Sequence, residues 1–332
     1  MAIMARGLTP KLLAWFRRRR RDLPWRRTRS PYRIWIAEIM LQQTRSAAVV
    51  PYYRRFLRRF TGVKSLSRAR EGEVLALWSG LGYYSRARNL RRAAQQILTT
   101  RGGGLPHTYE EWRTLPGVGP YTAAAIASIG YGEPVAVLDG NVARVMARLT
   151  ARRGDIRSPR VREELRLAAQ ELLDRRNPGD FNQALMELGA TVCLPRGPRC
   201  PACPLARWCQ ARRLGLVNKL PVRRRTPAPV EVHATAAVAR RNGRILMRRR
   251  PPAASLMPGF WELPPADTPG LRLAGRLGAF RHSITNHQYT VEVFAAVAPT
   301  RPPTGCRWMG SKNIARLPLT TIARKALQLD TS

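Results

Sequence analysis

The sequence contains no long hydrophobic run near its N-terminus. The apolar segment Leu12–Phe16 spans five residues, and the basic residues 17–21 follow it directly. A helix that spans a bilayer needs about 20 apolar residues, and a secretory signal needs an apolar region of about 7–15 residues. This absence excludes an exported or membrane-spanning N-terminus, so we expect a cytoplasmic protein.

Acidic residues are also scarce, since 20 Asp and Glu residues stand against 59 Lys and Arg residues and the formal net charge is +39. A surface this basic attracts phosphate, because each neutralised phosphate releases condensed counterions. However, 54 of the 59 basic residues are arginine, and GC-rich coding is an alternative source of such a bias. The charge therefore supports nucleic-acid binding without establishing it.

The length of 332 residues and the hydrophobic content of 44% favour two domains. Residues 1–215 are predicted to be all-α, because apolar and basic residues alternate at helical spacing between short Gly/Pro turns. Residues 216–230 combine prolines with a run of charges, which is typical of a linker. Residues 231–332 contain strand-like runs at 231–240, 244–249 and 288–298 and a helical run at 319–328, which predict an α+β domain.

Cysteine is rare, yet four of the five cysteines fall within seventeen residues. They are spaced C-x6-C-x2-C-x5-C and comprise Cys193, Cys200, Cys203 and Cys209. Four thiolates in one loop can hold zinc or an iron-sulfur cluster. Zinc sites more often use paired C-x2-C knuckles, so the spacing favours [4Fe-4S], and a disulfide framework suits short secreted chains instead. Cys306 lies outside this loop and is expected to be dispensable for the metal.

One carboxylate stands alone in an apolar segment. Residues 34–41 (IWIAEIML) are predicted to form a buried helix in which Glu38 is the single ionisable residue. Glu38 shares a helical stripe with Ile34 and Leu41, so it either faces a pocket or is paired in the core. Burial raises the pKa of a carboxyl group, and a carboxylic acid that stays protonated near neutral pH can protonate a leaving group.

A glycine-rich turn joins two predicted helices at 115–121 (LPGVGPY). Gly117 and Gly119 allow left-handed backbone and a close approach to phosphate, and the next helix N-terminus supplies free N–H groups. Asp139 follows twenty residues after Gly119 and precedes an apolar helix, where its ordinary role would be an N-cap. Each feature is weak evidence when it is taken alone.

Together these features resemble the helix-hairpin-helix DNA glycosylase superfamily, in which a similar hairpin, aspartate and iron-sulfur loop occur in this order. Within it, three segments look like the MutY-type adenine DNA glycosylases, namely RDLPWR at 21–26, AEIMLQQT at 37–44 and GLGYYSR at 80–86. The bifunctional endonuclease III type has a lysine where this chain has Tyr121. The resemblance therefore implies a monofunctional enzyme that excises adenine paired with 8-oxoguanine or guanine in double-stranded DNA.

The resemblance also implies roles for individual residues. Glu38 matches the acid that protonates adenine, and Asp139 matches the carboxylate that stabilises the cationic sugar. Tyr121 and Asn141 match residues that orient the acid, the water and the sugar. The residues that match the adenine pocket are Arg21, Leu23, Trp25, Arg26 and Leu41, and those that match insertions into the DNA stack are Gln43 and Tyr83.

The C-terminal segment resembles the Nudix-like recognition module of the same family, through RRRPP at 248–252, GFWELP at 259–264 and the RH pair at 281–282. Nudix hydrolases use a cluster of metal-binding carboxylates, but Asp267 is the sole acidic residue between 265 and 285, so pyrophosphatase activity is not expected. The family commonly shows Phe-Ser-His where this chain has Ile284, Thr285 and Asn286. We expect Thr285 and Asn286 to contact the base opposite adenine, with the preference for 8-oxoguanine left open.

Two other functions fit parts of the sequence. One is an endonuclease III-like glycosylase/lyase for damaged pyrimidines, which Tyr121 and the additional C-terminal domain disfavour. The other is a non-catalytic DNA-binding protein, which the presence of both Glu38 and Asp139 disfavours. The resemblance implies a monomer associated with the bacterial nucleoid.

Overall fold

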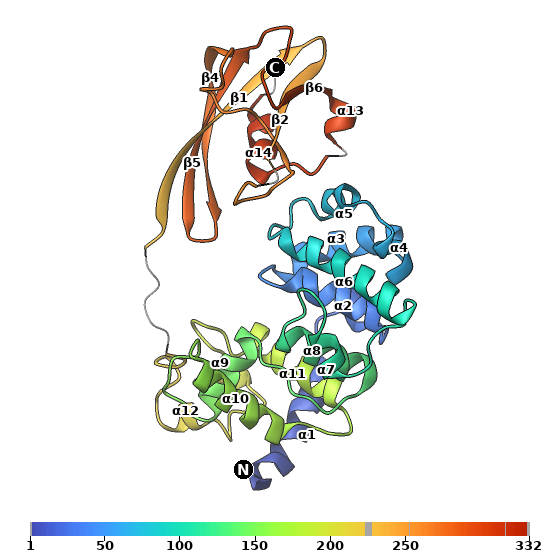
Figure 1. Cartoon of the computed structure of the whole chain (residues 1–332). Coiled ribbons are helices and arrows are strands. Elements are labelled where there is room, and N and C mark those ends of the chain that lie inside the picture. Colours follow the sequence, from blue (N-terminus) through green and yellow to red (C-terminus); the bar gives the residue numbers. More distant parts are fainter. Residues whose placement is uncertain (1, 223–227, 252, 316, 331–332) are drawn as a thin grey trace. The chain divides into compact units, whose positions relative to one another are not determined.

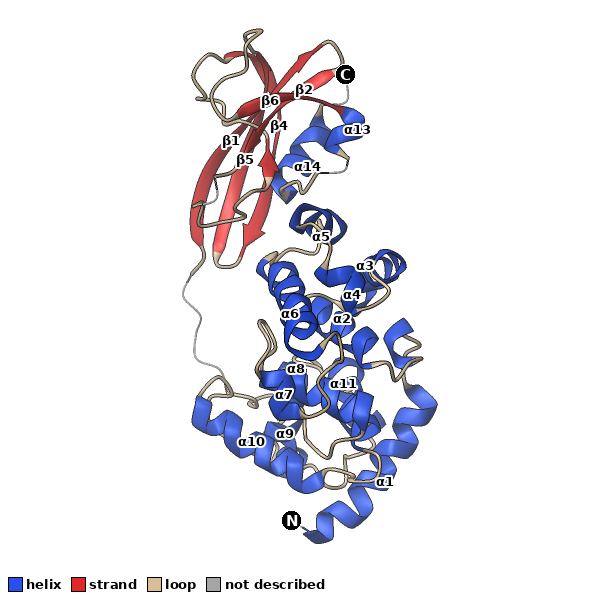
Figure 2. Cartoon of the chain, turned by 45° about the vertical axis from the view of Figure 1, so that its right-hand side comes forward, coloured by secondary structure: helices blue, strands red, loops and turns tan. Residues whose placement is uncertain are grey.

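The computed structural model describes residues 2–222, 228–251, 253–315 and 317–330. The chain divides into two compact units, of which the first comprises residues 1–68 with 89–225 and the second comprises residues 69–88 with 226–332. The linker predicted at 216–230 includes residues 223–227, which lie outside the described residues. Figure 1 labels the elements in chain order, and Figure 2 separates helices from strands by colour.

The first unit is helical. Its α-helices are α1 (Ala2–Arg19), α2 (Pro31–Leu41), α3 (Ser46–Arg59), α4 (Val63–Ser67), most of α6 (Ser85–Arg101), α7 (Tyr109–Arg113), α8 (Pro120–Ile126), α9 (Gly140–Leu149), α10 (Pro159–Leu172), α11 (Pro178–Thr191) and α12 (Gln210–Arg213). Short 3₁₀ turns lie at Pro24–Arg26 and Cys200–Ala202, and a π-helical turn at Ala127–Tyr131 extends α8. The predicted all-α character of this region is confirmed.

Helix α2 forms the centre of this unit. It begins as the sequence predicts, because the Ser30 hydroxyl accepts a hydrogen bond from the Arg33 N–H and Pro31 occupies the first turn, where a missing N–H is harmless. The helix is buried along most of its length, including Glu38, and Trp35 packs against Trp112 of α7. Burying a large aromatic side chain contributes about 1.5–3 kcal/mol, so the apolar residues hold Glu38 in place.

Helix α11 packs closely on its neighbours because small residues face them. A Cβ atom built on Gly179 would come within 2.8 Å of Ser128 O, and one built on Gly189 would come within 2.7 Å of the Asn141 Cβ. Contacts this short exclude any larger side chain without a shift of the backbone. The two glycines therefore set the distance of α11 from the π-helical turn and from α9.

The second unit is built on a sheet. It contains α5 (Glu71–Trp78), β1 (Val230–Arg241), β2 (Arg244–Arg249), β3 (Trp261–Glu262), β4 (Arg272–Ile284), β5 (His287–Val297), β6 (Cys306–Gly310), α13 (Ser311–Ile314) and α14 (Thr321–Leu329). The strand order is β3-β2-β1-β5-β4, and β6 also pairs with β2. Strands β1 and β5 run parallel, and the other pairs are antiparallel.

Helix α14 covers one face of this sheet, where Ala323 and Ala326 pack with Val291 and Val293 of β5. The predicted α+β character is confirmed, and so are the strand-like runs that became β1, β2 and β5. Helix α1 and strand β4 were not predicted. Within the described residues, no helix combines the length and the apolar character needed to span a bilayer.

Candidate active site

A single cavity of about 990 Å³ in the helical unit collects most of the predicted site residues. It lies among α2, α8, α9 and α11 and the segment that precedes α2. Ten predicted residues line it, namely Arg21, Leu23, Trp25, Arg26, Glu38, Leu41, Gln43, Tyr121, Asp139 and Asn141. We call this cavity the α2–α11 pocket. It brings together predicted residues from two segments of the chain, 21–43 and 121–141.

Glu38 and Tyr121 form the acidic centre of the pocket. Glu38 is 4% exposed, and the Tyr121 hydroxyl donates a hydrogen bond of 2.7 Å to its Oε2. Burial raises the pKa of Glu38 from 4.5 to about 7, although the Tyr121 bond opposes this rise. The Tyr121 hydroxyl also lies 3.1 Å from the Met186 Sδ. When Glu38 is protonated, its O–H can donate to the hydroxyl, whose own proton then turns toward the sulfur, so both charge states keep a partner.

Asp139 serves as both a helix cap and a site residue. Its Oδ1 accepts a 2.7 Å bond from the Val142 N–H at the start of α9, and its Oδ2 accepts a 3.0 Å bond from the Asn141 side-chain amide. Burial raises the pKa of Asp139, while these bonds act in the opposite direction. The charge of Asp139 in turn raises the pKa of Glu38. The two carboxyl groups therefore favour a state in which Glu38 holds a proton.

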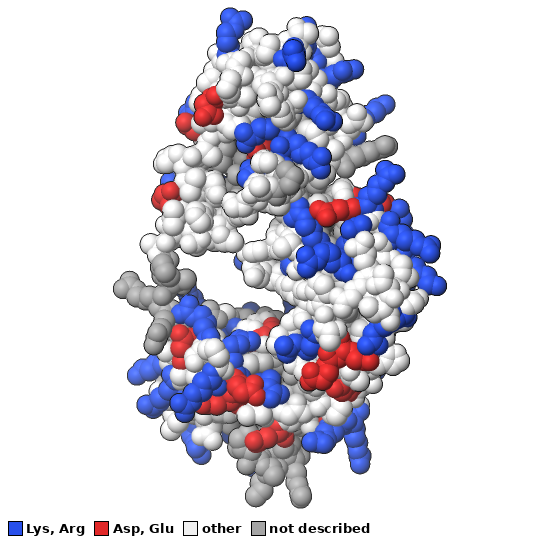
Figure 3. Space-filling view, in the orientation of Figure 1, with Lys and Arg blue, Asp and Glu red and all other residues white. Residues whose placement is uncertain are grey.

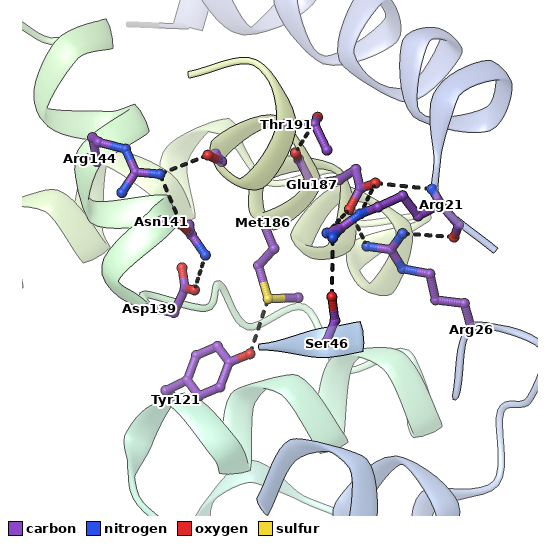
Figure 4. Close-up of polar contacts among 11 residues, drawn as sticks. Arg21, Arg26, Ser46, Tyr121, Asp139, Asn141, Arg144, Met186, Glu187 and Thr191 are labelled. Carbon is purple, nitrogen blue, oxygen red and sulfur yellow. Dashed lines mark hydrogen bonds and ion pairs between the residues drawn. The ribbon is translucent and has the colours of Figure 1, made fainter. Parts of the chain in front are cut away.

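Figure 4 shows how Asn141 is held. The Arg144 Nη2 donates to the Asn141 Oδ1 at 2.9 Å and to the Gly189 O at 2.7 Å. This contact leaves the Asn141 NH₂ group facing Asp139. Arg144 was not predicted, although an arginine in an apolar helix is the kind of signal that singled out Glu38.

An ion-pair cluster with a buried carboxylate at its centre and a partly exposed Arg21 borders the pocket on the other side of Met186 (Figure 4). Glu187 of α11 is completely buried and pairs with Arg21 and with Arg26 at 2.8 Å each. Burial alone would raise the pKa of Glu187, but the hydrogen bonds from both arginines outweigh it and lower the pKa to about 2. Glu187 was not predicted. It lies among apolar residues of α11, and the criterion used for Glu38 would have found it.

The remaining predicted residues of the pocket form its walls and rim. Trp25 is buried and contacts Tyr53 edge to face, with a ring separation of 5.4 Å. Gln43 is exposed and has a φ of 57°, which is a strained conformation for a residue other than glycine. Strain of this kind is found at functional sites, where it aims a side chain that would otherwise relax.

The predicted hairpin is present in the helical unit. Gly117 has a φ of 77°, and a Cβ built on it would come within 2.7 Å of the Asn89 Cβ, so glycine is required on both grounds. Gly119 caps α8, and Pro120 occupies its first turn. Neither glycine lines the α2–α11 pocket within the part of the chain that the structure describes.

Three predicted residues belong to the second unit. Tyr83 is 43% exposed and has a φ of 48°, and the Arg86 guanidinium lies over its ring. Thr285, with a φ of 55°, and Asn286 are exposed at the turn between β4 and β5. The roles of these residues in contacting DNA stay predictions.

The cysteine loop follows α11 directly. Burial raises the pKa of Cys203 to about 12, with a smaller rise from the charges of Cys193, Cys209 and Cys200 included in that value and a backbone hydrogen bond at Leu205 acting against it. The four thiols thus lie within electrostatic reach of one another. Among the described residues, no group of three or more His, Cys, Asp or Glu side chains is close enough to hold a metal ion as it stands.

Arg148 of α9 lies beneath this loop and is 2% exposed. Its Nη1 donates to the Cys193 Sγ at 3.3 Å and to the Leu194 O at 2.7 Å, and its Nε donates to the Leu220 O at 2.9 Å. No carboxylate in the described ranges forms an ion pair with this guanidinium. A buried cation in contact with the Cys193 thiol fits a loop that would carry negative charge with a metal bound.

Basic residues extend well beyond the site. Figure 3 shows Lys and Arg side chains spread over the visible face of each unit, while the acidic side chains gather in smaller groups. Several of the acidic groups are paired with arginines, as in Arg152–Glu164 and Arg166–Glu163. The surplus of positive charge is therefore left at the surface, where it can meet phosphate.

Several known proteins of base excision DNA repair are similar in sequence to this chain. Residues 36–171 match the HhH-GPD superfamily of base excision DNA repair proteins. The human adenine DNA glycosylase is 47% identical over 210 residues, which cover 60% of this chain and 38% of the human protein. The mouse adenine DNA glycosylase is 34% identical over 396 residues, which cover 96% of this chain and 76% of the mouse protein.

A solved structure extends the likeness to three dimensions. A thermostable thymine-DNA glycosylase matches with a TM-score of 0.59 at 28% identity, covering 64% of this chain and 98% of that one. The overlap spans a region of the size of the helical unit, while the match to the mouse protein spans nearly the whole chain. The chain therefore belongs to the adenine DNA glycosylase family of helix-hairpin-helix base-excision repair proteins.

Proposed function

We propose that this protein excises adenine from A:8-oxoG and A:G mispairs in double-stranded DNA and leaves the DNA strand intact. One observation carries the proposal. Glu38, Tyr121 and Asp139 line a single pocket, and burial raises the pKa of Glu38 to about 7. An acid with such a pKa is partly protonated at neutral pH, which suits the departure of a poor leaving group such as adenine.

The reaction begins with extrusion of the adenosine from the DNA stack, because the N-glycosidic bond is inaccessible within it. Glu38 transfers its proton to adenine N7, the C1′–N9 bond breaks, and its electron pair leaves with adenine. The sugar then carries positive charge, as in glycoside hydrolysis. Asp139 stabilises that cation, and water adds to C1′ and releases a proton to a carboxylate. The products are free adenine and an abasic site.

The position of Tyr121 supports a monofunctional enzyme. The bifunctional type would carry a lysine here, and a lysine amine would form a Schiff base with C1′. The Tyr121 hydroxyl instead donates to Glu38 and belongs to the acid centre. We expect no covalent adduct in the presence of borohydride and no strand cleavage before alkali or heat. Efficient trapping would favour the glycosylase/lyase alternative.

We also propose that Cys193, Cys200, Cys203 and Cys209 hold a [4Fe-4S] cluster, which would act in structure rather than in the chemical step. The donor set is four thiolates from one loop, and Arg148 places a buried positive charge against Cys193. Such a charge stabilises the thiolates that metal binding requires. The cluster would tie the loop to α9 and α11, the helices that hold Asp139 and Glu187.

The second unit is proposed to read the base opposite adenine through Thr285 and Asn286. Guanine and 8-oxoguanine differ at O8 and N7–H, so discrimination requires a polar contact there. One good contact of this kind is worth about 1–3 kcal/mol. A full-length Thr285→Ala/Asn286→Ala protein should lose about 5- to 150-fold on A:8-oxoG and less on A:G. Equal loss on both mispairs would show that this turn adds general DNA affinity alone.

A direct test uses single-turnover adenine release from duplexes that contain A:8-oxoG, A:G or A:C. We expect the wild-type protein to act on the first two, and Glu38→Gln to abolish release while affinity stays within roughly tenfold. Glu163→Gln is a matched control, since Glu163 is an exposed carboxylate paired with Arg166 on α10. A near-wild-type rate for Glu38→Gln would remove Glu38 from the mechanism.

A further inference from the structure

Glu187 is a completely buried carboxylate at the edge of the α2–α11 pocket, and its oxygens are fully engaged. Its Oε1 accepts bonds from the Arg21 backbone N–H at 3.0 Å and from the Arg21 Nε at 2.8 Å. Its Oε2 accepts bonds from the Arg21 Nη2 and the Arg26 Nη2 at 2.8 Å each. A carboxylate has about four acceptor sites, so Glu187 has none left for a substrate. Any effect on the reaction must pass through the arginines.

The arginines are held in defined orientations by this carboxylate and by further contacts. Arg21 makes a two-pronged contact with Glu187, and its Nη1 donates to the Ser46 hydroxyl at 3.2 Å. Arg26 donates to the Arg21 carbonyl at 3.1 Å and lies over the Phe16 ring at 5.4 Å. Planar, bidentate contacts fix a guanidinium far better than a single bond does. Both arginines line the pocket, so their positions define one of its walls.

The charge of this cluster also reaches Glu38. The groups that act on Glu38 come from separate elements: Tyr121 from α8, Asp139 from α9 and Arg26 from the turn before α2. The positive charge of Arg26 lowers the pKa of Glu38, while the negative charge of Asp139 raises it. Glu187 is paired directly with Arg26, so it offsets part of the positive charge that Glu38 experiences.

We propose that Glu187 is a positioning residue that fixes Arg21 and Arg26 as a wall of the α2–α11 pocket and offsets the positive charge that they place near Glu38. This proposal rests on the proposed function and deepens it. Loss of the negative charge would leave Arg26 unbalanced, and the Glu38 acid would lose its proton at lower pH. Loss of the hydrogen bonds would also free two long side chains that the reaction needs in place.

The experiment measures single-turnover adenine release from A:G duplex across the neutral pH range for wild type, Glu187→Gln and Glu187→Asp. We expect Glu187→Gln to lower the rate about 10- to 100-fold, as a displaced pocket wall does. Its fall in rate on the alkaline side should also begin at a lower pH than in wild type. Glu187→Asp keeps the charge, so its pH midpoint should match wild type while its rate falls less. Glu163→Gln serves as the surface control.

Each outcome separates the possibilities. A Glu187→Gln protein with the wild-type rate and pH midpoint overturns the proposal while the proposed function stands. If the rate of Glu187→Gln falls by the same factor at every pH, Glu187 does not act on the charge near Glu38. The proposal is then overturned, and Glu187 has a purely structural role. If circular dichroism shows that Glu187→Gln does not fold, Arg26→Met carries the test, since removal of that positive charge must move the midpoint upward; an unmoved midpoint overturns the proposal. Absence of adenine release by wild type would instead refute the proposed function.

Discussion

Replacement of Glu38 by glutamine should stabilise the fold in a pH-dependent way while it destroys the activity. In the unfolded chain Glu38 has its ordinary pKa of 4.5, and in the folded protein burial raises the pKa to about 7. The folded state therefore binds this proton more tightly than the unfolded state does. The resulting stability is fully present below pH 4.5 and is lost as the pH rises through about 7.

The size of the effect follows from the pKa rise. A change from 4.5 to about 7 corresponds to about 3 kcal/mol, because each pH unit is worth about 1.4 kcal/mol. Glu38 is only 4% exposed, so solvent does little to reduce this cost. Above neutral pH the wild-type protein must bury an ionised carboxylate, whereas the glutamine variant buries a neutral amide that the Tyr121 hydroxyl can still contact.

Urea unfolding of both proteins, at a pH no higher than the unfolded-state pKa of 4.5 and at a mildly alkaline pH, tests the reasoning. The free energy of unfolding of Glu38→Gln relative to wild type should increase by about 3 kcal/mol between the two conditions. Other groups that titrate, including Asp139, are common to both proteins and largely cancel in the difference. If the difference between the two proteins is the same at both pH values, Glu38 does not have the raised pKa on which the proposed acid catalysis depends.

Three further predictions concern other parts of the molecule. Tyr121→Phe removes the hydroxyl that lowers the pKa of Glu38, so the alkaline fall of the rate–pH profile should move to higher pH; an unchanged profile would contradict this contact. Cys203→Ser should lose the roughly four irons that elemental analysis is expected to find, while Cys306→Ser keeps them; one zinc in wild type would reverse the cluster assignment. Gly189→Ala should destabilise the fold by about 1–3 kcal/mol in chemical denaturation, because its methyl group would meet α9 at 2.7 Å; wild-type stability would show that the helices can separate freely.

The helices around the site were predictable because their signals are local. Ser30 and Pro31 mark the start of α2, and Asp139 caps α9, as the sequence indicates. Strand β4 was missed because Gly275 and Gly278 interrupt its pattern, and both positions coincide with irregular pairing to β5. The alternation of apolar and polar residues predicts a strand poorly where a β-bulge shifts the side chains from one face of the strand to the other.

The residues that line the pocket were predicted more completely than the contacts between them. Glu38 and Tyr121 were assigned to one pocket, and the structure joins them by a hydrogen bond. The ion pairs of Glu187 could not be predicted in the same way, because Arg21 lies 166 residues away in a sequence with dozens of arginines. A lone buried acid is visible in the sequence, but the choice of its basic partner depends on packing alone.

Helix α11 combines contacts that would fail together if its length changed. The helix has fourteen residues. Asn182 accepts a hydrogen bond from the Val137 N–H, and the Met186 sulfur contacts the Tyr121 hydroxyl. Glu187 forms ion pairs with two arginines, and Gly189 packs against α9. Each residue turns the helix by about 100°, so one inserted or deleted residue would rotate every later contact out of its site. Substitutions on the outer face of α11 should be tolerated. Insertions or deletions between residues 182 and 189 should abolish activity.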